Sequence, residues 1–336
     1  MNKPIRSLLA SILDYAGLFP PAGLEMVAAV SNYAAYRACE HAWMLGRFIV
    51  PVARLEEFET AVEEHASRLN GHRAAVSGAR DQTLRLSVLA ATNLEADLAA
   101  IADFNGRHAA SDGAGCAEPV TAPLTPTLSP RRGGRGQGEG ACAFLIDTIE
   151  LKATRPDEIT KAMQQVPAGL CAYVEVPVSS DESMLAAARA AGARVKVRTG
   201  GVTRNAFPTC DDLAQFLVRC ARAGVPFKAT AGLHHPVRSV QRLTYADDSP
   251  CGTMHGFLNV FLAAAGVRAG MTGDEATRLL AESGQVAFRF GEHGASWGRY
   301  RWSNVELRAT REEFAISFGS CSFQEPIDDL RGMRLL

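Results

Sequence analysis

Residues 195–201 read Val-Lys-Val-Arg-Thr-Gly-Gly, and residues 226–236 read Pro-Phe-Lys-Ala-Thr-Ala-Gly-Leu-His-His-Pro. Each run has the composition of a short β-strand with a lysine near its middle and a glycine turn towards its end. Between them, residues 211–223 predict a helix, because apolar residues recur at helical spacing and a glycine follows the last of them. The stretch is therefore a β-α-β unit, and a right-handed crossover of this kind makes the two strands parallel neighbours. Its lysines, Lys196 and Lys228, are then expected side by side.

The same alternation of strand and helix continues on both sides of this unit. Apolar runs predict further strands at residues 12–18, 44–51, 84–92, 143–151, 171–177 and 314–323. Helical periodicity predicts helices at residues 24–38, 55–69, 94–104, 156–166 and 182–191. With the two lysine strands, about eight parallel strands alternate with helices. This predicts an α/β fold, a single (β/α)8 TIM barrel domain over residues 1–336.

Two segments interrupt the alternation. Residues 105–141 contain a stretch rich in proline, glycine and arginine without an apolar period, which predicts a disordered low-complexity loop insert. Residues 237–312 have helical periodicity and many aromatic side chains. They are expected to form an inserted helical and aromatic segment over the barrel mouth, before the last strand.

Composition places the chain among soluble globular proteins. With 47% hydrophobic residues, 21% charged residues and a formal net charge of −1, it has the features of neither a nucleic-acid-binding nor a membrane protein. The N-terminus lacks a secretory signal pattern, so a cytoplasmic location is expected. The cysteines are scattered, which predicts free thiols. Cys321, between two serines at a strand end, is a candidate nucleophile, although the sequence fixes no histidine beside it.

Active sites of (β/α)8 barrels lie at the C-terminal ends of the strands. Two ammonium groups brought together there lower the pKa of one of them, which makes a lysine a nucleophile near neutral pH. The alternative is that Lys196 and Lys228 only extend their charged groups into water and stabilise the mouth. The polar residues expected at this mouth are Asp14, Asp147, Glu150, Glu175, Lys196, Arg198, Lys228, Thr230, His234, His235, Ser320 and Ser322.

Short motifs along the chain resemble those of the class I (Schiff-base) aldolases of the deoxyribose-phosphate aldolase family. The resemblance implies a (β/α)8 barrel that makes or breaks carbon–carbon bonds in a small carbonyl substrate. Residues 14–21, 228–236 and 319–323 are also similar to those of a bacterial family without assigned chemistry. The aldolase-like motifs follow that family's order over most of the chain: Ile12-Leu13-Asp14-Tyr15, Ile146-Asp147-Thr148-Ile149, Val174-Glu175, Lys196-Val197-Arg198-Thr199-Gly200, Lys228-Ala229-Thr230-Ala231-Gly232 and Gly319-Ser320-Cys321-Ser322.

The resemblance implies roles for individual residues. Lys196 forms the Schiff base, Lys228 perturbs its pKa, and Asp147 and Glu175 complete the catalytic set. Arg198 differs from the family's pattern, so whether the substrate carries a phosphate stays open. The residues expected to bind substrate are Arg198, Gly200, Gly201, Thr230, Gly232, His234, His235, Ser320 and Ser322.

The expected partner is a small anionic or carbonyl-containing molecule. Nucleic acid and membrane are not expected as partners, and a homo-oligomer stays open. No glycine-rich nucleotide-binding motif occurs, and neither a cofactor nor a metal is predicted for the aldolase.

Two other functions stay open. A metal-dependent barrel lyase or hydrolase would use His234, His235 and Glu175 as ligands, joined by His255 or His293. Adjacent residues of a strand point to opposite faces, so His234 and His235 reach one ion only if the strand ends before them. The third function is a non-catalytic barrel that binds a sugar or an anion.

Overall fold

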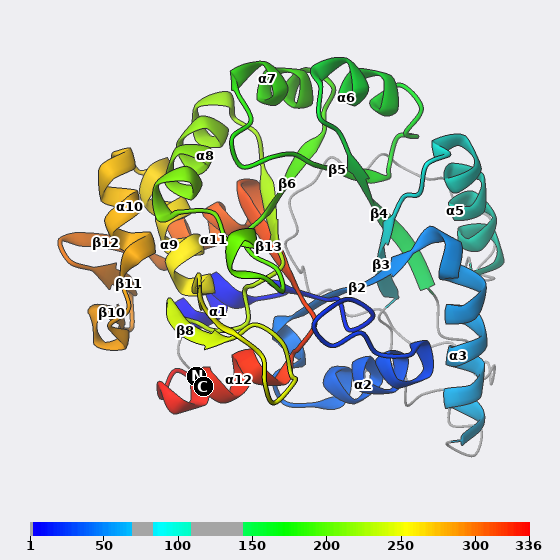
Figure 1. Ribbon diagram of the computed structural model, residues 1–336, viewed down its shortest axis with the longest axis horizontal. Coiled ribbons are helices and arrows are strands. Elements are labelled where there is room, and N and C mark those ends of the chain that lie inside the picture. The colour runs from blue at the N-terminus through cyan, green and yellow to red at the C-terminus, as the bar shows by residue number, and fades with distance from the viewer. Residues whose placement is uncertain (1–2, 69–82, 109–143) are drawn as a thin grey trace, which may run out of the picture.

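A computed structural model of the chain describes residues 3–68, 83–108 and 144–336. Its parallel strands close into a barrel in the order β1-β13-β7-β6-β5-β4-β3-β2, with helices around it (Figure 1). The predicted α/β class and (β/α)8 barrel are confirmed. The barrel strands are β1 (Leu13–Tyr15), β2 (Leu45–Pro51), β3 (Leu84–Leu89), β4 (Phe144–Lys152), β5 (Cys171–Glu175), β6 (Arg194–Arg198), β7 (Phe227–Thr230) and β13 (Ala315–Ser320).

Helices follow the barrel strands in the chain and cover the outside of the barrel. The helices are α1 (Lys3–Leu9), α2 (Met26–Ala38), α3 (Leu55–Arg68), α5 (Leu94–His108), α6 (Pro156–Met163), α7 (Glu182–Ala190), α8 (Cys210–Ala223), α9 (Phe257–Arg268), α10 (Gly273–Ala281), α11 (Asn304–Glu313) and α12 (Gln324–Gly332). Short 3₁₀ helices are η1 (Ala42–Met44), η2 (Val52–Arg54), η3 (Arg204–Ala206) and η4 (Gln285–Ala287).

Helix α8 shows how local sequence sets the central β-α-β unit. The Thr209 Oγ1 accepts the Asp212 N–H at 3.0 Å, and the Asp212 carboxylate accepts the Thr209 N–H at 3.3 Å, which forms a capping box. Gly224 ends the helix with φ 64°, a conformation that glycine adopts at little cost. The chain then returns as β7, where Lys228 pairs directly with Lys196 of β6, as the sequence predicts.

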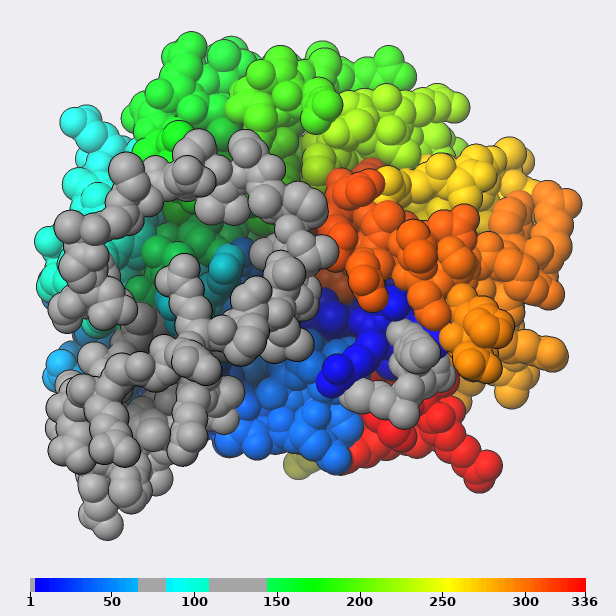
Figure 2. Space-filling model, turned by 180° about the vertical axis from the view of Figure 1, so that it is seen from behind, coloured from blue at the N-terminus to red at the C-terminus, as the bar shows by residue number. Residues whose placement is uncertain are grey.

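The segment between β7 and β13 is divided between the mouth and the side of the barrel. The hairpin of β8 (Ser239–Arg242) and β9 (Cys251–Met254) lies at the mouth, where the Arg204 Nε donates to the Cys251 carbonyl at 2.7 Å. Helix α9 packs against α8, α10 and α11 and joins the outer helices. The sheet of β10 (Phe288–Phe290), β11 (Gly294–Trp297) and β12 (Tyr300–Ser303) lies at the side, near α1 and α11 (Figures 1 and 2). The β8–β9 hairpin thus has the place that the sequence predicts for all of residues 237–312.

The predicted loop insert falls largely outside the described residues. Residues 105–108 complete α5, and residues 109–141 are not described. The described cysteines are free thiols, as predicted. Among the described helices, none is long and apolar enough to span a membrane.

Two loops meet at glycines beside the ends of β6 and β7. A Cβ added to Gly200 would lie 2.9 Å from the Gly232 Cα and would overlap the Phe207 ring. Gly232 itself has φ 74°, where other residues are strained. These two glycines, expected to bind substrate, therefore also allow close contact between the loops.

We expect Gly200→Ala to lower the free energy of unfolding by about 1–3 kcal/mol, because overpacking forces the backbone to shift. Urea denaturation measures this change. Gly106→Ala in α5 is the matched control, since its Cβ would meet nothing within 4 Å. Alanine in a helix is favoured over glycine by roughly 0.5–1 kcal/mol, so this control should be neutral or stabilising. Equal losses in both variants would contradict the packing role of Gly200.

Candidate functional site

A cluster of charged side chains occupies the centre of the barrel. Glu150 of β4 bridges the two lysines: its Oε2 lies 2.8 Å from the Lys196 Nζ, and its Oε1 lies 2.7 Å from the Lys228 Nζ. Glu175 at the end of β5 contacts the Lys196 Nζ at 2.7 Å. Asp14 of β1 contacts the Lys228 Nζ at 2.6 Å. We call these five residues the lysine–carboxylate cluster.

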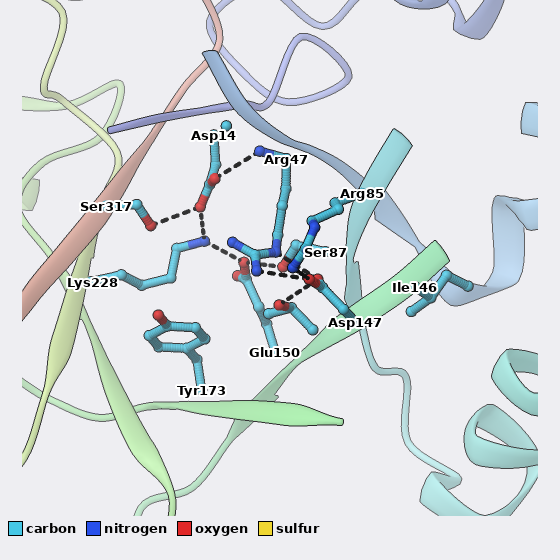
Figure 3. Close-up of polar contacts among 12 residues, drawn as sticks. Asp14, Arg47, Arg85, Ser87, Ile146, Asp147, Glu150, Tyr173, Lys228 and Ser317 are labelled. Atoms are coloured by element: carbon cyan, nitrogen blue, oxygen red, sulfur yellow. Dashed lines mark hydrogen bonds and ion pairs between the residues drawn. The ribbon is translucent and has the colours of Figure 1, made fainter. Parts of the chain in front are cut away.

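Neutral donors complete the hydrogen bonding of the cluster (Figure 3). The Ser87 Oγ donates to the Glu150 Oε1 at 2.8 Å, and the Ser317 Oγ donates to the Asp14 Oδ2 at 2.8 Å. The backbone N–H of Arg47 donates to the Asp14 Oδ1 at 2.9 Å. The carboxylates of Asp14 and Glu150 therefore each accept several hydrogen bonds. These bonds offset part of the free-energy cost of removing the two charges from water.

Burial and mutual attraction set the charge of the cluster. Glu150 and Lys228 are only 4% and 1% exposed. Burial raises the pKa of Glu150, but the two lysines outweigh this effect and hold that pKa well below its usual range. Burial lowers the pKa of Lys228, but Asp14 and Glu150 outweigh it and raise that pKa above its usual range. Lys228 is therefore a fixed positive charge beside Lys196 at neutral pH.

Asp147 belongs to a different ion-pair group from the lysines. Its carboxylate accepts from the Arg47 Nε at 2.6 Å and Nη2 at 2.8 Å, and from the Arg85 Nη1 at 2.9 Å. Burial raises the pKa of Asp147, and the two arginines outweigh it, so the pKa is lowered. Asp147 is expected in the catalytic set beside the lysines, but Glu150, three residues later, is the β4 carboxylate that contacts them.

A β-bulge in β4 explains why both carboxylates face the interior. The pairing of β3 with β4 shifts by one residue between Leu86 and Ser87, so Asp147 has no register partner on β3. On a regular strand, side chains three residues apart point to opposite faces. With the bulge, Asp147 and Glu150 both point inward (Figure 3). A one-residue bulge has no signal in the apolar pattern, which is why the sequence does not separate their roles.

Each barrel strand contributes polar side chains to these interior groups. The Tyr173 ring lies 5.3 Å from the Lys228 Nζ, and its hydroxyl accepts from the Arg194 Nη1 at 3.1 Å. Interiors of (β/α)8 barrels are usually filled by branched apolar side chains. A charged interior costs desolvation free energy, so it indicates a function for the cluster. Strand by strand, the groups are Asp14, Arg47, Arg85 and Ser87, Asp147 and Glu150, Tyr173 and Glu175, Arg194 and Lys196, Lys228, and Ser317.

A cavity of about 550 Å³ opens at the mouth beside the cluster. Glu175 lines this cavity and also binds Lys196, so the cavity meets the cluster at Glu175. The second carboxylate that lines the cavity belongs to Asp212, which caps α8. Lys152 and Arg198 line it as exposed cations, and neither forms an ion pair within the described parts of the chain. The cavity is therefore suited to an anionic ligand.

The other residues expected to bind substrate have local roles. The Ser320 Oγ donates to the Ser322 carbonyl at 2.8 Å and accepts the Ser322 N–H at 3.3 Å. Thr230 pairs with Arg198 in the register of β6 and β7. A Cβ on Gly201 would lie 2.8 Å from the Ala206 Cβ. Of the residues expected to bind substrate, only Arg198 is among the described residues that line the cavity.

The histidines after β7 bind carboxylates of α12. The His234 Nδ1 lies 2.9 Å from the Glu325 Oε2, and the His235 Nδ1 lies 2.6 Å from the Asp329 Oδ2. Glu175 binds Lys196 instead. Within residues 3–68, 83–108 and 144–336, no group of three or more His, Cys, Asp or Glu side chains could hold a metal ion. The ligands expected for the metal-dependent alternative do not converge.

Arg47 and Lys152 are candidate functional residues that the sequence pattern does not single out. Arg47 is a charge within the apolar strand predicted at residues 44–51, and this is a usable signal for an interior ion pair. Lys152 follows directly after the strand predicted at residues 143–151, so a small error in the strand end hides it.

Comparisons of the chain with protein-family models, with curated proteins and with solved structures find no match.

Proposed function

We propose that the protein is an aldolase-type lyase that makes or breaks a carbon–carbon bond through a Schiff base on Lys196. The observation that carries this proposal is the contact between Lys196 and Glu175, because Glu175 also lines the cavity. A small carbonyl compound in the cavity would contact Glu175, whose Oε2 lies 2.7 Å from the Lys196 Nζ.

Lys196 loses a proton before its amine attacks a carbonyl carbon. Two carboxylates lie within reach of this proton, Glu175 at 2.7 Å and Glu150 at 2.8 Å from Nζ. The low pKa of Glu150 makes it a weak proton acceptor. The Glu175 side chain is 14% exposed and faces the cavity, so we assign the role of general base to Glu175. Asp147, ion-paired with Arg47 and Arg85, is given no proton-transfer step.

The proposed reaction begins when the Lys196 amine adds to the carbonyl carbon. The electron pair of the C=O π bond moves to oxygen, Glu175 returns the proton, and loss of water gives a protonated Schiff base. In the cleavage direction, a base removes the β-hydroxyl proton, the Cα–Cβ bond breaks, and an aldehyde leaves. The bonding pair moves towards the iminium nitrogen and forms an enamine. Protonation at carbon and hydrolysis release the second carbonyl product and restore Lys196.

The charges of the cavity support an anionic substrate. Lys152 and Arg198 are cations at the ends of β4 and β6, and Glu175 lies between their strands. A carboxylate or phosphate group bound by these cations would hold the substrate's carbonyl group near Lys196.

Borohydride trapping tests the Schiff base. Incubation with small aldehydes or 2-oxo acids followed by borohydride should leave a reduced adduct on Lys196, located by peptide mass spectrometry. Lys196→Ala should abolish this adduct, and Glu175→Gln should slow its formation by roughly 10²–10⁴-fold, the usual contribution of a general base.

Lys161→Ala is the matched control, because Lys161 is an exposed lysine of α6 that pairs with Asp157 and does not line the cavity. This variant should form the adduct at the rate of the unmodified protein. If no carbonyl compound gives an adduct, while Arg198→Ala weakens binding of an anion, a non-catalytic anion-binding barrel replaces the lyase.

A further inference from the structure

We propose a second nucleophilic centre at the barrel mouth, in which Cys321, His234 and Glu325 transfer an acyl group from an ester or a thioester. This centre shares no residue with the lysine–carboxylate cluster. It therefore does not depend on the proposed lyase function.

Three elements bring the centre together. Cys321 follows β13, His234 follows β7, and Glu325 lies in the first turn of α12. The Cys321 Sγ lies 4.0 Å from the His234 Nε2, and the His234 Nδ1 lies 2.9 Å from the Glu325 Oε2. One ring nitrogen thus faces a thiol and the other a carboxylate. A nucleophile, a base and a group that orients the base have this same order in acyl-transfer triads.

The surroundings favour a charged imidazole ring. His234 and Cys321 are each 6% exposed. Burial lowers the pKa of His234, but hydrogen bonds to Cys321 and Glu325 outweigh it and raise that pKa to about 9. His234 is therefore positively charged at neutral pH, with its Nε2 4.0 Å from the Cys321 Sγ. Helix α12 begins three residues after Cys321, so the positive end of its dipole also lies near the sulfur.

Tyr245, in the loop between β8 and β9, contacts both the thiol and the carboxylate of this centre. Its Oη lies 3.7 Å from the Cys321 Sγ and donates to the Glu325 Oε2 at 3.2 Å. Tyr245 is 55% exposed, so it can move without disturbing the core. Burial of its hydroxyl raises the pKa of Tyr245, which keeps it a hydrogen-bond donor at neutral pH. It can therefore donate to an oxygen that becomes negative next to the sulfur.

The remaining titratable groups around the thiol do not compete with His234. Tyr15 of β1 and Tyr36 of α2 face Cys321, and burial raises the pKa of both, so they stay neutral. His235 is ion-paired with Asp329 on the side of α12. His234 is thus the cation in contact with the sulfur among the described residues.

The proposed reaction balances without a cofactor. The Cys321 thiolate attacks the acyl carbon, an S–C bond forms, and the π electron pair moves to the carbonyl oxygen. The oxyanion collapses, the bond to the leaving alcohol or thiol breaks, and His234 gives that group its proton. Water then attacks the acyl-cysteine, its proton returns to His234, and the acid and the thiolate are released.

Alkylation by iodoacetamide tests the nucleophile. At about pH 6, Cys321 should be alkylated at least about tenfold faster than Cys251, because ordinary thiols are almost fully protonated there. Cys251 is an exposed thiol of the same chain, so it serves as the internal control. His234→Asn should remove this difference, and Glu325→Gln should reduce it with little change in melting temperature. Tyr245→Ala, which opens access to the sulfur, should increase the rate.

Acylation by p-nitrophenyl acetate tests the activity. Intact-mass spectrometry should detect one acetyl group on Cys321, and release of p-nitrophenol should continue after the first turnover. Cys321→Ser should lose both signals and still form the borohydride adduct on Lys196, which separates this centre from the lyase. If Cys321 stays unmodified in the unmodified protein and in Tyr245→Ala, the proposal is overturned. Alkylation without acetylation would also refute acyl transfer.

Discussion

Glu150→Gln should lower the free energy of unfolding by about 3–5 kcal/mol, the usual loss when one partner of a buried ion pair is removed. Glutamine keeps the size of the side chain but removes the negative charge between two buried ammonium groups. Lys196 and Lys228, 3% and 1% exposed, would then repel each other with less compensation. Chemical denaturation followed by circular dichroism measures the loss.

Two further variants show whether this loss comes from the buried charges. Glu57→Gln removes a carboxylate from an exposed ion pair with Arg54 and should leave stability nearly unchanged. The double variant Glu150→Gln/Lys228→Met should be more stable than Glu150→Gln alone, because it removes one of the two uncompensated cations. If the loss of unfolding free energy in the double variant equals the sum of the losses in Glu150→Gln and Lys228→Met, the two residues are not energetically coupled.

Stability should fall as the pH rises from about 6.5 to about 9, by on the order of 3 kcal/mol from His234 alone. The folded protein raises the pKa of His234 from 6.5 to about 9, so the folded state binds its proton more tightly than the unfolded state. This contribution is fully present below pH 6.5 and is lost as the pH passes through the folded-state pKa.

Denaturant titrations across this pH range, compared between the unmodified protein and His234→Gln, isolate the effect. The difference in unfolding free energy should shrink with rising pH. His293→Gln is the control, since the His293 side chain is 93% exposed. A difference between the unmodified protein and His234→Gln that does not change with pH would contradict a strongly bound proton on His234.

The fold follows from the sequence because each β-α unit has its own local signals. Residues 211–223 have an apolar face and a capping box at one end, with a left-handed glycine at the other. Such signals do not depend on distant parts of the chain, so the strands and their order are predictable. The β8–β9 hairpin is less predictable from the sequence, because its strands are short and pair with one another.

The site is only partly predictable, because it depends on contacts between distant strands. The pairing of Lys196 with Lys228 follows from strand periodicity. The choice of Glu150 over Asp147 depends on a bulge fixed by the register with β3. The approach of His234 to Cys321 joins residues 87 positions apart, and no local pattern encodes it.

The charged interior divides the chain into two complementary halves. Strands β1–β4 supply Asp14 and Glu150, whereas β5–β7 and β13 supply Lys196 and Lys228. Three of the four ion pairs of the lysine–carboxylate cluster therefore cross between the halves. A chain cut between β4 and β5 would leave Asp14 and Glu150 without a lysine in one fragment and Lys228 without a carboxylate in the other, while Lys196 keeps Glu175. Co-expressed fragments should therefore recognise each other by charge, and each should remain poorly folded when it is alone.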